Sequence, residues 1–142
     1  MVTAFNIMFS KAAAAKVMCC AASDILQVRK FAFVAWVWVR GQRPRFVSLK
    51  AFKIAFVMRR MRAAVALKAE QWDNIPAYFT VRNEEKGSSY PVEMCSYGPK
   101  CECEDYRNQK KFFGKGVCKH GYAALGVLGY GSLGSYLEAR PA

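Results

Sequence analysis

The spacing of hydrophobic and polar residues divides the N-terminal half of the chain into helical and extended segments. Residues 3–22 are rich in alanine and predict a helix. Residues 31–39 form a β-branched and aromatic run, typical of a strand buried on both faces, although periodicity alone does not exclude a buried helix. Breaker residues at 40–44 predict a turn. Apolar residues then recur every three or four positions over residues 48–71, which predicts an amphipathic helix.

Local signals mark both ends of this second helix. Ser48 belongs to the residue types that cap a helix N-terminus. Residues 72–76 are expected to end the helix, because Pro76 pushes the residue before it out of helical geometry. Near the C-terminus, closely spaced glycines lower helix stability, so the tail from Gly129 is expected to be loose.

Positive charge is concentrated in the first half of the chain. Residues 1–69 hold 13 Lys or Arg against Asp24 alone, whereas residues 70–142 hold nine charges of each sign. This asymmetry favours contact with nucleic acid or an anionic membrane surface, and the alternative is a solvated basic face. Trp36 and Trp38 are expected in the core because of their size, and the alternative is a platform on which nucleic-acid bases stack.

The cysteines and the apolar runs indicate in which cellular compartment the protein is expected. Cys19 and Cys20 are adjacent and suit a disulfide framework poorly, so bound metal in a reducing compartment explains the six cysteines better. The longest uncharged apolar run, residues 31–39, has nine residues against the roughly 20 needed to span a bilayer. No signal peptide is expected either, because residues 1–10 carry no Lys or Arg and Lys11 and Lys16 interrupt the segment that follows. An intracellular protein without a membrane span is therefore expected.

Four residues give the clearest chemical signal in the sequence, that of a metal site. Cys101 and Cys103 form one close pair, and fourteen residues separate that pair from a second, Cys118 and His120, which contains the only histidine of the chain. Two local pairs of Cys or His joined by a spacer are typical of a tetrahedral, structural Zn²⁺ site. Such a site holds four protein ligands and leaves no position for an activated water. Cys95 is either a reserve ligand or a small buried side chain.

Catalysis is not expected from this residue set. The sole histidine is assigned to the metal, so no Ser-His or Cys-His pair remains. Residues 129–134 match G-x-G-x-x-G, but only eight residues follow, too few for the surrounding βαβ unit. We therefore expect no enzyme and no small-molecule substrate.

The ligand pairs and the residues after Cys103 resemble a known family. Together with Asp105 and Tyr106, the C-x-C and C-x-H pairs resemble the SWIM zinc-finger family. The resemblance covers roughly residues 60–128. It implies a ββα finger: a hairpin at residues 78–82 and 90–94, carrying Tyr90 and Val92, then a zinc knuckle and a helix at residues 122–128. It also implies binding to nucleic acid or protein, since family members accompany transposases, helicase-like ATPases and recombination factors. A free-standing finger would then act as an adaptor.

The spacer between the ligand pairs, residues 107–116, is read as a loop and is the best candidate for nucleic-acid contact. It mixes cations with aromatic rings, as single-stranded nucleic-acid sites do. The alternative is that the rings pack on the finger while the cations are solvated. The candidate residues are Arg107, Lys110, Lys111, Phe112, Phe113 and Lys115.

The expected fold class is α+β. A basic, mostly helical N-terminal extension, residues 1–57, would precede the zinc finger with its leading helix, residues 58–128, and a glycine-rich tail, residues 129–142. If Met58 or Met61 is the natural start, the charge asymmetry disappears with the extension. The leading hypothesis is a zinc module that binds DNA or RNA, and the alternative is a protein–protein adaptor.

Overall fold

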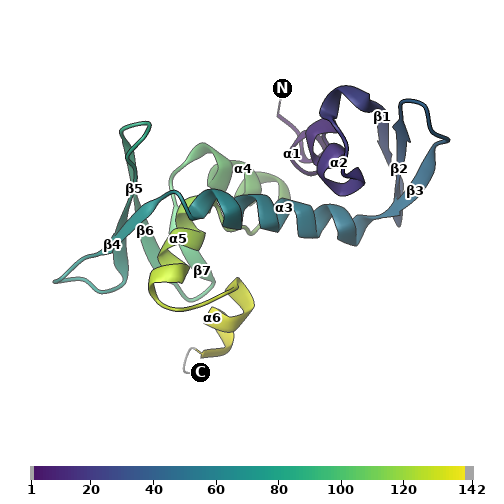
Figure 1. The fold of residues 1–142 in the computed structure, drawn as a ribbon. Coiled ribbons are helices and arrows are strands. Elements are labelled where there is room, and N and C mark those ends of the chain that lie inside the picture. Colours follow the sequence, from purple (N-terminus) through teal and green to yellow (C-terminus); the bar gives the residue numbers. More distant parts are fainter. Residues whose placement is uncertain (1, 140–142) are drawn as a thin grey trace. The chain divides into compact units, whose positions relative to one another are not determined.

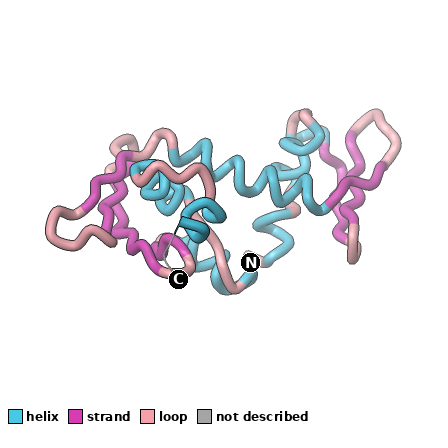
Figure 2. Tube along the Cα trace, turned by 90° about the horizontal axis from the view of Figure 1, so that it is seen from below, coloured by secondary structure: helices cyan, strands magenta, loops and turns pink. Residues whose placement is uncertain are grey.

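The chain forms an α+β fold with two separate antiparallel sheets. The structure is a computed structural model that describes residues 2–139, and the chain divides into unit 1, Met1–Arg59, and unit 2, Arg60–Ala142. Unit 1 contains a three-stranded sheet and unit 2 a four-stranded sheet, each accompanied by helices (Figures 1 and 2). The expected ββα finger is thus too simple, and the expected mostly helical extension is wrong because unit 1 contains a sheet.

The first elements of unit 1 are two short helices rather than one. Phe9 ends the first helix, and the Ser10 hydroxyl caps the second by accepting a hydrogen bond from the Ala13 amide at 3.1 Å. The helix predicted at residues 3–22 is therefore interrupted, because serine offers the backbone a competing partner. The elements are α1 (Ala4–Met8), α2 (Lys11–Met18) and the 3-10 turn η1 (Ala22–Asp24).

The sheet of unit 1 has the order β1-β2-β3, with β1 at Ile25–Lys30, β2 at Val34–Val39 and β3 at Arg45–Ser48. The predicted strand exists but begins at Val34, and the turn at residues 40–44 is confirmed.

Only one face of this sheet is buried in the core. Ala35, Val37 and Val39 pack in one cluster with Phe9 and Phe52. The residues between them in β2 lie on the other face, where Trp38 is 39% exposed and Trp36 is half-buried. The expectations of a doubly buried strand and of tryptophans in the core are therefore wrong.

The long helix α3, Leu49–Ala64, crosses the division between the two units. Ser48 caps it as predicted, since its hydroxyl accepts a hydrogen bond from the Ala51 amide at 3.2 Å. The helix ends at Ala64, so the predicted extension to residue 71 is wrong. The residues concerned form strand β4, Lys68–Gln71, which pairs with the next strand from Lys68↔Arg82 to Gln71↔Phe79. Inter-strand hydrogen bonding overrides a helical pattern here.

The sheet of unit 2 has the order β4-β5-β6-β7. The predicted hairpin is confirmed as β5 (Tyr78–Asn83) and β6 (Ser88–Cys95). The segment before the first metal-ligand candidate forms a further strand, β7 (Gly98–Cys101), paired with β6. Phe79, Val81 and Val92 are fully buried in one cluster with three of the cysteines.

The helices of unit 2 are α4 (Glu104–Phe113), α5 (Lys119–Val127) and α6 (Leu133–Ala139). The spacer read as a loop is mostly helix α4, and the helix expected after His120 begins earlier, at Lys119. The tail expected to be loose contains α6, where Tyr136 is buried and its hydroxyl donates to the Cys95 carbonyl at 2.9 Å. The tail prediction is wrong in this part, and residues 140–142 lie outside the described residues. Among the described residues, no helix has the length and apolar character needed to cross a bilayer.

Candidate metal centre

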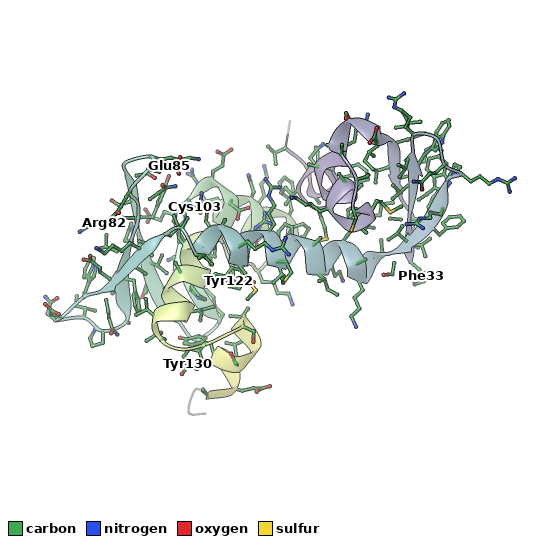
Figure 3. All side chains as sticks on the ribbon, in the orientation of Figure 1. Phe33, Arg82, Glu85, Cys103, Tyr122 and Tyr130 are labelled. Atoms are coloured by element: carbon green, nitrogen blue, oxygen red, sulfur yellow. The ribbon has the colours of Figure 1, made fainter. Side chains whose placement is uncertain are left out.

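Three elements of unit 2 converge on one cluster of metal-ligating side chains. Cys101 is the last residue of β7, Cys103 is the N-cap of α4, Cys118 is the N-cap of α5, and His120 lies in the first turn of α5. Figure 3 labels Cys103. All four residues are buried, with 1–5% of their surface exposed. The two sequence pairs thus meet because one strand end and two helix starts lie together.

The spacing of the donor atoms suits one tetrahedral ion. The four ligand atoms all lie within 4.8 Å of one another. The His120 Nδ1 atom is 3.8 Å from the Cys101 Sγ atom and 3.7 Å from the Cys118 Sγ atom. Metal bonds of about 2.0–2.3 Å in a tetrahedron would place neighbouring ligands about 3.5–3.8 Å apart. This cluster can therefore hold one metal ion.

The electrostatics of the cluster favour a cation. Hydrogen bonding with Cys101, and then with Cys118, lowers the pKa of the Cys103 thiol, and the same bond to Cys103 raises the pKa of Cys101 to about 11. Hydrogen bonding with Cys101 likewise raises the pKa of Cys118. Hydrogen bonding among the three sulfurs thus favours the thiolate at Cys103 over a thiolate at Cys101 or Cys118. A divalent cation would replace the remaining thiol protons, and the partial positive charge at the N-termini of α4 and α5 stabilises the thiolates that would bind the cation.

A partly buried polar network supports the ligand-bearing elements. Arg60 binds Asp105 with both ends of its guanidinium, Nε to Oδ2 at 2.9 Å and Nη2 to Oδ1 at 2.7 Å. The Gln109 amide donates to Asp105 at 3.0 Å and to the Val117 carbonyl at 3.1 Å, and its oxygen accepts from the Val117 amide at 3.1 Å. Gln109 therefore holds the residue before Cys118 against α4.

Replacing Gln109 tests this supporting role. Gln109→Leu leaves the buried polar groups of Val117 unsatisfied, so we expect a loss of about 1–3 kcal/mol in the free energy of unfolding. We also expect metal affinity to fall about 10–100-fold, as for other residues that orient ligands. Urea unfolding and competition with a chromophoric chelator measure the two effects. The control is Arg107→Gln on the exposed side of α4, which should change stability by less than about 0.5 kcal/mol. Equal effects of the two substitutions would contradict the role.

Close packing beside the metal ligands involves residues that the sequence did not single out. A Cβ atom at Gly121 would lie 2.9 Å from the Val117 Cγ1 atom and 3.0 Å from the Pro99 Cβ atom, so α5 approaches β7 only because this position is glycine. A side chain at Gly116 would clash with Gln109. In the sequence, the only sign of this packing constraint is that Gly121 directly follows His120.

Two predicted features near the cluster have specific places in the structure. The ring of Tyr90, a residue of the family resemblance, lies 4.8 Å from the His120 ring between centroids. Cys95 ends β6, its sulfur lies 3.7 Å from the Glu93 carbonyl oxygen, and it is not part of the four-donor cluster. The arrangement therefore brings together the four predicted ligands without Cys95.

The predicted nucleic-acid contacts lie on and just after α4. Arg107, Lys110 and Lys111 are exposed on this helix, whereas Tyr106 and Gln109 are buried. Phe112 and Phe113 are half-buried, and Lys115 is exposed after the helix ends. The cations are thus all exposed, while the two rings are partly covered by the protein.

No family profile, curated protein or solved structure matches the chain. The class is therefore defined by fold and site alone: a two-unit α+β chain whose second unit contains a buried Cys₃His cluster able to hold one metal ion.

Proposed function

We propose that unit 2 is a SWIM-type zinc module that binds DNA or RNA, with the zinc in a structural role. The observation that carries this proposal is the buried cluster of Cys101, Cys103, Cys118 and His120. Three thiolates and one imidazole form a soft donor set that suits Zn²⁺, whereas Mg²⁺ and Ca²⁺ prefer oxygen. Cys101, Cys103 and Cys118 are free thiols, as an intracellular zinc protein requires.

A structural role follows from the number and burial of the ligands. Four protein ligands complete a tetrahedron and leave no position for a water nucleophile. The cluster also joins β7, α4 and α5: the end of β7 bears one donor and the starts of the two helices bear the other three. The proposed role is therefore non-enzymatic: the ion holds the helices in place so that α4 presents its basic side.

The nucleic-acid surface proposed for unit 2 is the exposed side of α4. The Lys110 ammonium lies 5.0 Å from the Tyr97 ring centroid and that of Lys111 5.3 Å from the Phe112 ring centroid. Cations held beside aromatic rings on one helix face can neutralise successive phosphates.

Salt dependence tests this surface. For the full chain we expect one zinc ion per molecule by metal analysis, and an oligonucleotide affinity that falls steeply with salt. Replacing both Lys110 and Lys111 by alanine should flatten the slope of log K against log salt by about 1.4 for single strands and about 1.8 for duplex. The matched control is Lys86→Ala in the exposed turn between β5 and β6, which should leave the slope unchanged. A slope that does not respond to the α4 substitutions would reject the surface.

A specific observation favours the adaptor as second candidate. Unit 2 contains an apolar groove of about 390 Å³ lined by residues of α3, β4, α5 and the turn after α5. Val65 and Val127 in its wall are 87% and 53% exposed, and Tyr122 and Tyr130, labelled in Figure 3, also line it. Exposed apolar area of this kind is typical of protein contacts. Val127→Lys should abolish such a contact and leave oligonucleotide binding intact.

A further inference from the structure

The outer face of the unit 1 sheet carries a row of aromatic and basic side chains. Residues paired across antiparallel strands lie on the same face of a sheet. Arg29 of β1 pairs with Trp36 of β2, which pairs with Phe46 of β3, and Trp38 lies on the same side two residues further along β2. Phe31, after β1, adds a fifth side chain. We call Arg29, Phe31, Trp36, Trp38 and Phe46 the aromatic face.

The rings of the aromatic face are close together and accessible. The centroids of Trp36 and Trp38 are 6.3 Å apart, and those of Phe31 and Phe46 are 6.4 Å apart. The Arg29 guanidinium carbon lies 5.8 Å from the centroid of the Trp36 ring. Phe46 is 67% exposed, Phe31 48% and Trp38 39%. Ring surface is thus available across all three strands.

The core of unit 1 does not need these rings. The opposite face of the same strands is closed by Phe9, which follows α1, by Ala14 of α2 and by Phe52 of α3, in one cluster with Ala35 and Val37. In Figure 1, α1 and α2 lie on one side of the sheet. Large apolar side chains gathered on the surface of a folded unit mark an interaction site.

The charge of unit 1 indicates an anionic ligand. Residues 1–59 hold ten Lys or Arg and one acidic residue, Asp24. Asp24 lies 3.9 Å from Arg40, at the end of the sheet. Arg29 belongs to the aromatic face itself, and Arg43 is exposed in the turn that leads into β3. Arg45 pairs with the core residue Val37 and so lies on the other face, where its Nη2 atom is 3.6 Å from the Met18 sulfur. The aromatic face therefore carries one cation among its rings and belongs to a strongly basic unit.

We propose that the aromatic face binds single-stranded nucleic acid by stacking bases on its rings while the surrounding cations neutralise phosphates. A sheet with accessible rings and nearby cations is suited to this, because every base has a π-face and stacking tolerates any sequence. A duplex hides its base faces within a stack of about 3.4 Å rise, so ring centroids more than 6 Å apart match separated bases instead. The surface lies wholly within residues 1–59, so this proposal stands whether or not α4 of unit 2 binds nucleic acid.

The test compares variants of Phe46 in the full chain, with a 20-nucleotide oligothymidine and its duplex with oligoadenosine as probes. Phe46→Ala should weaken single-strand binding about 5- to 100-fold in fluorescence anisotropy. Phe46→Leu, which keeps apolar bulk and lacks a ring, should weaken it almost as much, and Phe46→Tyr should bind like the wild type. Binding of the single strand should also quench tryptophan emission, and the duplex should bind more weakly. Because Phe46 is 67% exposed, the variants should retain the wild-type melting temperature.

Several outcomes would overturn the proposal. Unchanged single-strand binding in Phe46→Ala would show that the nucleic acid lies elsewhere, and wild-type binding in Phe46→Leu would show apolar contact without stacking. Vesicles of phosphatidylserine and phosphatidylcholine that bind the chain through Phe46, undisplaced by the oligonucleotide, would assign the face to a membrane surface. A variant with both Lys110 and Lys111 replaced by alanine distinguishes this site from the one proposed on α4. In that variant, Phe46→Ala should still weaken single-strand binding by the same factor, whether or not the two lysine substitutions change binding by themselves.

Discussion

Removing the proposed zinc ion from the full chain is expected to unfold unit 2. Structural zinc contributes an apparent binding free energy of about 10–16 kcal/mol at pH 7 in small zinc domains. A folded domain is stable by only about 5–15 kcal/mol in total. Cys101, Cys103 and Cys118 lie in the same core cluster as Phe79 and Val92, so losing the ion removes the link between β7, α4 and α5. The strands and helices of unit 2 should then lose their fixed packing together.

Tryptophan fluorescence can follow each unit separately. Trp72 lies in unit 2, where its ring stacks on Tyr78 at 5.0 Å and its indole nitrogen donates to Thr80 at 2.9 Å. A variant with Trp36→Phe and Trp38→Phe leaves Trp72 as the only indole, and chelator should shift its emission to longer wavelength. Trp72→Phe is the control that reports on unit 1, whose core cluster contains only residues 9–52, and its emission should not change. Unaltered Trp72 emission after complete removal of metal would refute the structural role.

Cys118→Ser is expected to have the largest effect of any single substitution at the cluster. Serine oxygen is a poor ligand for zinc compared with a thiolate, and even changes outside the ligand set lower affinity about 10–100-fold. We therefore expect a loss of more than about 100-fold. Cys118 is 1% exposed, so the buried hydroxyl should cost a further 1–3 kcal/mol or so. Metal content by native mass spectrometry and urea unfolding measure the two effects.

Cys95→Ser is the matched control for this experiment. It makes the same chemical change at a half-buried cysteine that ends β6 and is not part of the four-donor cluster. Metal content should remain at the wild-type level. If Cys95→Ser lost the metal and Cys118→Ser retained it, the ligand set would be wrong and Cys95 would have to replace Cys118.

The elements predicted from the sequence were those with strong local signals. The β5–β6 hairpin has two apolar segments around a polar turn, and the Ser48 cap at α3 depends only on nearby backbone. β3 and β4 were missed because Arg45–Ser48 and Lys68–Gln71 are short edge strands with charged residues. Such strands are held by hydrogen bonds to a neighbour distant in sequence, which no local pattern reveals. Helix α4 was read as a loop because its apolar positions are few.

The sequence predicted the four donor residues of the candidate metal site but not the residues that support them. The four donors were identified from spacing, since ligands on one chain occur as close pairs. Arg60 and Gln109 were not identified, because Arg60 meets Asp105 only when α3 lies beside α4, and Gln109 meets Val117 only when the start of α5 lies beside α4. Trp36 and Trp38 were assigned to the core by size, and the structure placed them on the outer face because β2 has only one face toward the helices.

By itself, the sequence determined which residues can ligate a metal and where positive charge is concentrated, because both follow from side-chain identity and position along the chain. It also determined the hairpin, whose pattern is local. Only the tertiary structure decided that β7, α4 and α5 bring the four donors within 4.8 Å of one another, and which face of the first sheet is left to solvent. These depend on contacts between distant segments, whose free energy comes from burial and inter-strand hydrogen bonding rather than from local preference.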